Sequence, residues 1–243
     1  MAEPTAAAIV IGNEILSGKV TDTNSSFLAR ELRSLGVSLQ RILVIPDEVE
    51  TIAEAIRAFR PVFDTVFTSG GVGPTHDDVT MAGVAAGLGV ELVRHPVLEE
   101  QIRQYSGGEL TEARAKMAEV PAGAELVFGE DVAFPVIKVR NIYILPGIPE
   151  LFRRKFLALR SRFAARPFHL RVIYLRGAES TFVPYLNATL AAFPELLLGS
   201  YPKLDDPEYH VRVTLESKDI DYLNRAFSHL LAQLPQEQVV RTE

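Results

Sequence analysis

A glycine-rich stretch at residues 68–80 most constrains what this chain can fold into. It follows a short apolar run and reads Thr68-Ser69-Gly70-Gly71-Val72-Gly73-Pro74-Thr75-His76-Asp77-Asp78-Val79-Thr80. Glycines let a backbone turn with its N–H groups outward, and such loops bind phosphate at the start of a helix. The stretch is interpreted either as a phosphate or pterin pocket, or as a tight turn whose aspartates cap the next helix.

Strand-like and helix-like segments alternate over the first two-thirds of the chain. Apolar runs near 7–11, 38–45 and 64–68 are separated by segments 24–35 and 48–60, which have helical periodicity. This alternation is typical of a mostly parallel sheet covered by helices, in which ligands bind beyond the carboxyl ends of the strands. We therefore expect the loops that follow these strands to lie at one rim.

Two helix starts are predicted from capping residues. Thr23 or Asn24 is expected to cap the helix at 24–35, and Asp77 to cap a helix that begins near Val79 with an acidic first turn. Apolar residues at helical spacing give the first of these helices a core-facing side. They are Phe27, Leu28, Leu32 and Leu35.

Four further segments have recognisable patterns. Residues 96–120 are predicted to be helical and charged, and to form an excursion over the rim. Residues 136–139 and 142–145 predict a β-hairpin. The Pro-Gly-Ile-Pro run at 146–149 is interpreted as a rigid loop leading into a helix. The three cations at 153–155 within that helix are interpreted as a solvated face.

The pattern changes beyond residue 168. Strand, helix, strand, strand, helix and strand are predicted in turn, at residues 170–176, 180–192, 196–201, 209–216, 220–234 and 239–242. This β-α-β-β-α-β order is that of a ferredoxin-like module. We predict an α/β domain over residues 1–166 and a small α+β domain over residues 167–243, joined by the linker at 164–167.

Composition excludes several classes of protein. With 243 residues and 47% hydrophobic content, the chain can bury one full core or a medium and a small one. The absence of cysteine excludes a disulfide scaffold and a thiolate zinc site. A net charge of −6 argues against nucleic-acid binding. The N-terminal apolar run is short and no basic region precedes it, so we expect no signal peptide, no membrane span and a cytoplasmic location.

The string Gly-Gly-x-Gly-Pro-Thr-x-x-Asp-x-Thr closely resembles the signature of the molybdopterin-binding fold. That fold is shared by molybdenum-cofactor adenylating proteins, by CinA-type competence/damage-inducible proteins and by the pterin-binding-like domain of FAD synthases. Residues 8–30 resemble the opening of the CinA-type branch, and residues 199–202 and 209–214 resemble its small second domain. The resemblance covers essentially the whole chain and implies a three-layer, mostly parallel α/β sheet followed by a small ferredoxin-like α+β domain. Neither an amidohydrolase domain nor a nucleotidyl-transfer domain is expected.

The resemblance also implies site residues. Asp47 and Asp78 match the functional acids of the fold. His76 is interpreted either as a phosphate or acid/base residue or as an exposed loop residue, and Glu14 either as a ligand contact or as a solvated acid. The residues expected to contact the ligand or its phosphate are Gly12, Glu14, Ser17, Asn24, Ser69, Gly70, Gly71, Gly73, Thr75, Thr80, Pro146 and Gly147.

Two carboxylates beside a bound phosphate are suited to a hard divalent cation. We therefore predict that Asp47 and Asp78 hold Mg²⁺, Mn²⁺ or Co²⁺ together with the ligand phosphate. The expected function is metal-dependent pyrophosphatase activity on ADP-ribose, FAD or a related nucleotide diphosphate. The alternatives are a protein that binds molybdopterin, or adenylylated molybdopterin, without turnover, and a regulatory ligand-binding protein. The expected partners are a small nucleotide or pterin and a second copy in a homodimer.

Overall fold

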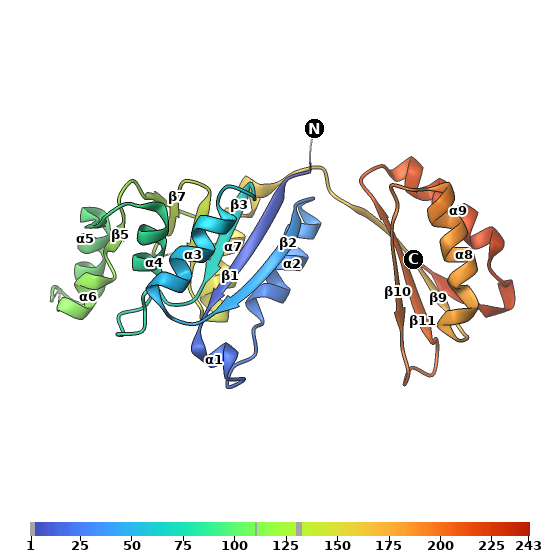
Figure 1. The fold of residues 1–243 in the computed structure, drawn as a ribbon, viewed down its shortest axis with the longest axis horizontal. Helices are drawn as coiled ribbons and strands as arrows, with labels where there is room; N and C mark the ends of the chain where they lie inside the picture. Colours follow the sequence, from blue (N-terminus) through green and yellow to red (C-terminus); the bar gives the residue numbers. More distant parts are fainter. Residues whose placement is uncertain (1–2, 110, 130–132) are drawn as a thin grey trace. The chain divides into compact units, whose positions relative to one another are not determined.

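The computed structural model describes residues 3–109, 111–129 and 133–243. They form two compact units that divide between Ala165 and Arg166, one residue before the predicted boundary. Over the described residues, the central sheet of the first unit has six strands in the order β2-β1-β3-β8-β7-β6 (Figure 1). Its strands are β1 (Thr5–Ile11), β2 (Ser38–Ile45), β3 (Thr65–Ser69), β6 (Glu125–Val127), β7 (Val136–Val139) and β8 (Ile142–Leu145).

Strands β1, β2, β3 and β8 run parallel, whereas β7 is antiparallel to β8 and completes the predicted hairpin. Strand β1 lies between β2 and β3 and is apolar and buried from Ala6 to Ile11, as expected for a strand covered on both faces. Successive side chains point to opposite faces. Ile9 and Ile11 therefore enter one core cluster and Ala6 and Ala8 enter the other.

Helices cover both faces of this sheet. On one face lie α2 (Asn24–Ser34) and α7 (Pro149–Leu159), whose Leu28 and Phe156 belong to the cluster that contains Ala8. On the other face lie α3 (Val49–Phe59) and α4 (Thr80–Leu88), whose Ile52 and Val84 belong to the cluster that contains Ile9. The predicted three-layer, mostly parallel α/β fold is confirmed.

A second small sheet and two helices form the predicted excursion. Strand β4 (Leu92–Arg94) pairs antiparallel with β5 (Glu119–Pro121), and between them lie α5 (Pro96–Tyr105) and α6 (Glu112–Lys116). Strands β4, β5 and β6 were not predicted from the sequence, and β5 overlaps the end of the segment 96–120 that was predicted to be helical. Each has only three residues, too few to show a clear alternation of apolar and polar side chains.

The second unit has the predicted β-α-β-β-α-β order. Its four-stranded antiparallel sheet has the order β10-β11-β9-β12. One apolar cluster joins the sheet to its two helices, with Ile173, Phe182 and Leu223 all fully buried. Its elements are β9 (His169–Leu175), α8 (Glu179–Ala192), β10 (Leu197–Pro202), β11 (Val211–Ser217), α9 (Ile220–Gln233) and β12 (Val239–Thr242).

In the part of the chain that the structure describes, every helix is too short or too polar to cross a membrane.

Candidate functional site

The loops that follow β1, β2, β3 and β8 lie at one rim of the central sheet, because these strands are parallel. The β3 and β8 loops are in direct contact. The Gly70 N–H donates to the Leu145 carbonyl over 3.2 Å. A Cβ on Gly147 would lie 3.2 Å from the Gly70 Cα. The structure therefore brings together the predicted residues of the glycine-rich loop and of the Pro146-Gly147 loop.

Two glycines fix the path of the loop after β3. Gly70 has φ +105°, and a Cβ there would overlap the Ile11 carbonyl oxygen. Gly71 has φ +62°, and its Cβ would overlap the Thr80 hydroxyl. That hydroxyl donates to the Gly70 carbonyl over 2.9 Å, and the Thr80 N–H donates to the Gly71 carbonyl over 3.0 Å. The loop is thus fastened to the start of α4 and admits only glycine at these two positions.

The prediction that Asp77 caps the next helix is wrong. Helix α4 begins at Thr80 after Val79; among the described residues no side chain caps it, and its first turn contains no acid. Asp78 instead folds back on the loop, where Oδ2 accepts the Thr75 N–H over 2.8 Å and also the Thr75 hydroxyl. A Cβ on Gly73 would lie 2.6 Å from this Oδ2, so the glycine leaves room for the carboxylate.

The flanking residues Asp77 and His76 point to solvent. The Thr75 side chain and the backbone N–H of Asp77 hold the pKa of the Asp77 carboxyl below its usual range. The His76 side chain is 98% exposed, and its Nδ1 lies 3.9 Å from Asp77 Oδ1. This exposure favours the interpretation of His76 as a loop residue over an acid/base role.

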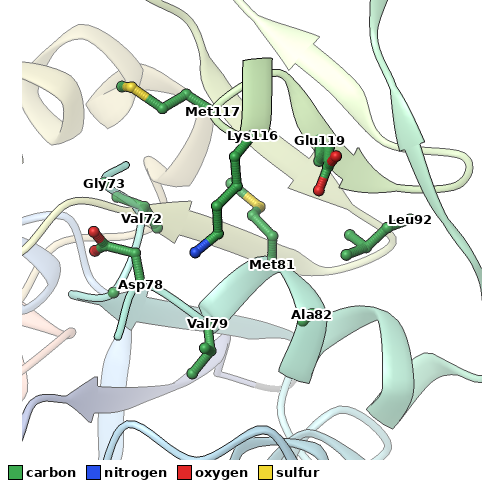
Figure 2. A pocket seen from close by; sticks show the side chains of 11 residues that line it. Val72, Gly73, Asp78, Val79, Met81, Ala82, Leu92, Lys116, Met117 and Glu119 are labelled. Atoms are coloured by element: carbon green, nitrogen blue, oxygen red, sulfur yellow. The ribbon is translucent and has the colours of Figure 1, made fainter. Parts of the chain in front are cut away.

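A hollow of about 70 Å³ lies beside the glycine-rich loop. Gly71, Gly73 and Asp78 line it from the loop, and Lys116 extends into it from α6 (Figure 2). The Lys116 Nζ donates to the Thr75 carbonyl over 2.6 Å. Sequence reasoning missed Lys116. The only signal was its place in the charged excursion predicted to lie over the rim.

Asp47 fixes a neighbouring loop. Its Oδ2 accepts the Asn13 N–H over 2.7 Å, which ties the loop after β2 to the start of α1 (Asn13–Leu16). Strand β1 separates β2 from β3, and the hollow beside the glycine-rich loop is lined by Asp78 and not by Asp47 over the described residues. The two predicted acids therefore share a rim but do not line the same hollow.

Asn24 joins three of the loops. Asn24 is only 5% exposed, and its Nδ2 donates to the Ser69 hydroxyl over 3.0 Å and to the Gly147 carbonyl over 2.8 Å. Its Oδ1 is buried and has no hydrogen-bond partner within the described part of the chain. Asn24 is therefore not the cap of α2. The N-cap position is held by Thr23, the other predicted residue, but its side chain forms no capping hydrogen bond with the described residues. The Asp22 carboxylate instead accepts the Ser25 N–H of the first turn over 3.0 Å.

A second hollow of about 50 Å³ lies between these loops. Glu14, Asn24, Ser69, Gly70 and Gly147 all line it. Glu14 folds back over Gly12, where a Cβ would lie 2.6 Å from its Oε1. Glu14 is therefore placed at the rim, whereas the Ser17 hydroxyl donates to the Glu14 carbonyl of its own turn over 3.3 Å and faces solvent.

A third hollow, of about 100 Å³, lies behind the loop. It is lined by Val72 and Pro146 of the rim loops, by apolar core side chains and by Lys155. The interpretation of residues 153–155 as a solvated face is wrong for Lys155. Its Nζ donates to the Pro135 carbonyl over 2.7 Å, and burial lowers the pKa of this lysine from 10.5 to about 8.

No group of three or more acidic or histidine side chains is placed to hold a metal ion in the ranges that the structure describes. Each predicted metal-binding acid uses Oδ2 for backbone N–H groups and keeps Oδ1 clear of hydrogen bonds within those ranges. Mg²⁺ commonly binds through one or two carboxylates and completes its shell with phosphate and water. The Oδ1 of Asp78 suits such a cation beside the hollow, whereas Asp47 does not line that hollow, so the two acids are not brought together as one donor set.

Two family descriptions match the chain. Residues 7–164 match "Probable molybdopterin binding domain", and residues 167–243 match "FAD synthase, middle domain". A protein of Archaeoglobus fulgidus is 36% identical over 218 residues, which cover 90% of this chain and 93% of that protein. A probable FAD synthase of Caenorhabditis briggsae is 31% identical over 88% of this chain, which spans only 46% of that relative.

A solved structure supports the same assignment. A CinA protein of unknown function from Thermoplasma acidophilum is 31% identical, with a TM-score of 0.61 over 66% of this chain and 98% of the other. An α/β domain with a glycine-rich rim and a ferredoxin-like module thus define the class. This chain belongs to the family of probable molybdopterin binding domains, and the resemblance predicted from its motifs is confirmed.

Proposed function

We propose that the chain is a metal-dependent pyrophosphatase that acts on ADP-ribose, FAD or a related nucleotide diphosphate. The observation that carries the proposal is the hollow in which Gly71, Gly73, Asp78 and Lys116 meet. Outward N–H groups and an ammonium ion suit phosphate oxygens, and a carboxylate beside them suits a hard cation. The family match and the relatives described as FAD synthases agree with a ligand that contains phosphate.

The residues of the rim have separable roles in this reaction. The loop at Gly71–Gly73 would bind the phosphate oxygens, because the Gly70 N–H is already bonded to the Leu145 carbonyl, and Lys116 would offset their negative charge. Asp78 would hold the cation through its Oδ1, which accepts no hydrogen bond from the described residues, and Asp47 would contribute its Oδ1 from the neighbouring loop of the same rim. When bound, such a cation stabilises the charge that develops on the phosphate and lowers the pKa of a bound water. Hydrolysis adds one water across the P–O–P bridge and yields two monophosphates.

Binding of molybdopterin without turnover is the second candidate function. The observation that favours it is the position of the Asp78 carboxylate, which accepts two hydrogen bonds from Thr75 and so also shapes the loop. If the Asp78 carboxylate had only this structural role, the rim could bind a phosphate group but could not hydrolyse a diphosphate.

Product analysis distinguishes the two candidates. The protein is incubated with ADP-ribose or FAD, with Mg²⁺, Mn²⁺ or Co²⁺ or with a chelator, and monophosphates are quantified. Release of AMP only in the presence of a divalent cation is the expected result. Ligand binding without any monophosphate would contradict the pyrophosphatase and favour the binding protein. Light scattering of the same sample tests the predicted homodimer.

A further inference from the structure

The second hollow of the rim, about 50 Å³ in volume, differs in charge from the hollow that contains Lys116. Among the described residues that line it there is no lysine, arginine or histidine, and its two ionisable side chains are Glu14 and Asp22. The Asp22 carboxylate accepts the Ser25 N–H over 3.0 Å, so the start of α2 already has its anion. Two carboxylates without a cation repel phosphate. This hollow therefore suits a group that donates hydrogen bonds.

The Glu14 carboxylate receives no hydrogen bond from the described residues. Its oxygens lie over Gly12, where a Cβ would be 2.6 Å from Oε1 and 2.8 Å from Oε2. The nearby Asn13 N–H donates to Asp47 instead, over 2.7 Å. An ionised carboxylate accepts through two oxygens, and hydroxyl donors form short, strong hydrogen bonds with it. Glu14 can therefore accept hydroxyl groups from a ligand.

Asn24 adds a second acceptor to this hollow. It lines the hollow, and its buried Oδ1 has no hydrogen-bond partner in the described part of the chain. Both hydrogens of Nδ2 are used, by the Ser69 hydroxyl and the Gly147 carbonyl, so the amide cannot turn its Oδ1 toward another donor. A buried carbonyl oxygen without a donor is costly. A hydroxyl group of a ligand would remove that cost.

The hollow adjoins the proposed phosphate site. Ser69 and Gly70 line it, whereas Gly71 and Gly73, further along the same loop, line the hollow that contains Lys116. Consecutive Cα atoms lie about 3.8 Å apart, so one small molecule can occupy both hollows. A volume of about 50 Å³ is less than that of about two waters, which suits the hydroxyl edge of a sugar and not a fused ring.

We infer that this hollow is a subsite for a vicinal diol, in which Glu14 and Asn24 accept hydrogen bonds from the two hydroxyls of a ribose. The inference rests on the proposed phosphate site and names its substrate class, a ribose phosphate whose 2′ and 3′ hydroxyls are both free. The sequence predicted Glu14 and Asn24 as contacts of a ligand or its phosphate, and the charge of the hollow assigns them to the sugar. A sugar without these hydroxyls would keep the phosphate contacts and leave both acceptors unused.

Titrations of the full chain with ADP and with 2′,3′-dideoxy-ADP test the inference, because the two ligands share their base and phosphates. No metal is added, so that no turnover occurs. The wild type should bind ADP at least roughly twentyfold more tightly, the product of one hydrogen bond to a charged acceptor and one to a neutral acceptor. Glu14→Ala should reduce this ratio about tenfold or more, and Asn24→Ala about two- to tenfold. A purely structural role would weaken both nucleotides alike and leave the ratio unchanged.

Glu54→Ala is the matched control, because it removes another exposed carboxylate, on α3, and should leave the ratio unchanged. If Asn24→Ala does not fold, the variant of the exposed Glu14 decides the question.

Three outcomes would overturn the inference. The first is a wild type that binds neither nucleotide or binds both equally. The second is a ratio that Glu14→Ala leaves unchanged. The third is a preference for ADP that appears only when Mg²⁺ is added, which would assign the hollow to a cation. Lack of ADP-ribose hydrolysis with the preference for ADP intact would contradict only the pyrophosphatase.

Discussion

Buried polar side chains lie in different kinds of place in the two units. Among the described residues of the first unit, such side chains stand at the rim, at the start of α2, the end of β3 and the start of α4. They are Asn24, Ser25, Thr68, Ser69 and Thr80. In the second unit they are Thr189 and Thr214. The Thr189 hydroxyl donates to the Tyr185 carbonyl of its own helix over 2.9 Å, a contact that serves the helix alone.

Sheet topology explains the difference. Parallel strands bring their following loops to one rim, where polar groups from distant parts of the chain accumulate. In the antiparallel sheet of the second unit, successive strands end at opposite edges, so the loops are divided between two ends. The first unit therefore gathers its buried polar groups at one rim, whereas the second unit does not.

The largest effect on stability is expected when Gly70 is replaced. Gly70→Ala should reduce the free energy of unfolding by roughly 3 kcal/mol or more, because the positive φ is strained and the Cβ overlaps the Ile11 carbonyl. Gly89→Ala is the matched control, since Gly89 has φ +67° but open space around its Cβ. It should cost about 1 kcal/mol. Equal melting temperatures for the two variants would show that the loop path at Gly70 is not fixed by that carbonyl.

The next-largest effect is expected on turnover, when the aspartates of the rim are replaced by asparagine. Asp78→Asn and Asp47→Asn should fold normally, since an amide oxygen still accepts the N–H groups of Thr75 and Asn13. They should lose roughly two or more decades of turnover, because the amide lacks the charge that holds a cation. Asp77→Asn should stay within a few-fold of the wild type. Similar behaviour of all three variants would show that these acids serve the fold.

Asn24→Ala in the first unit and Thr189→Val in the second compare the cost of losing a buried polar group in each unit. Removing the amide leaves the buried Ser69 hydroxyl and the Gly147 carbonyl without this donor, at a cost of about 1–3 kcal/mol, and should weaken ligand binding. Thr189→Val in the second unit should cost less than about 1 kcal/mol, because that hydroxyl only adds a bond within its own helix. Denaturant unfolding and a binding titration measure both. A larger loss of unfolding free energy in Thr189→Val than in Asn24→Ala would contradict this contrast between the two units.

Lys155→Met should make the chain more stable at pH 7 by roughly 1–2 kcal/mol, after the lost bond to Pro135 is subtracted. The wild-type pKa is about 8 when folded and 10.5 when unfolded. Between these values the unfolded state binds more protons, so wild-type stability rises with pH. The advantage of the variant should therefore shrink as pH rises from 8 to 10.5. A constant difference in unfolding midpoints across that range would show that Lys155 is not desolvated.

The sequence predicted the elements whose residues form long local patterns. The apolar runs of β1 and β2 and the β-α-β-β-α-β order of the second unit are examples, and the glycine-rich loop had a motif of its own. Lys116 and Lys155 were beyond reach, because they come to the rim from α6 and α7, far along the chain. The contact of Asp78 with Thr75 was missed for a local reason, since an aspartate next to a helix start is satisfied equally by a helix cap and by a turn within the loop.

Ligand binding by a truncated chain tests most directly whether the first unit contains the whole site. A chain that ends at Arg166 keeps both apolar clusters of the first unit and every residue of the rim. It should bind ADP-ribose and FMN within about threefold of the full chain, the spread expected when no contact is lost. Circular dichroism confirms that it folds. A folded truncation that binds neither ligand would contradict the account and assign part of the site to the second unit, near Tyr201 or Tyr209.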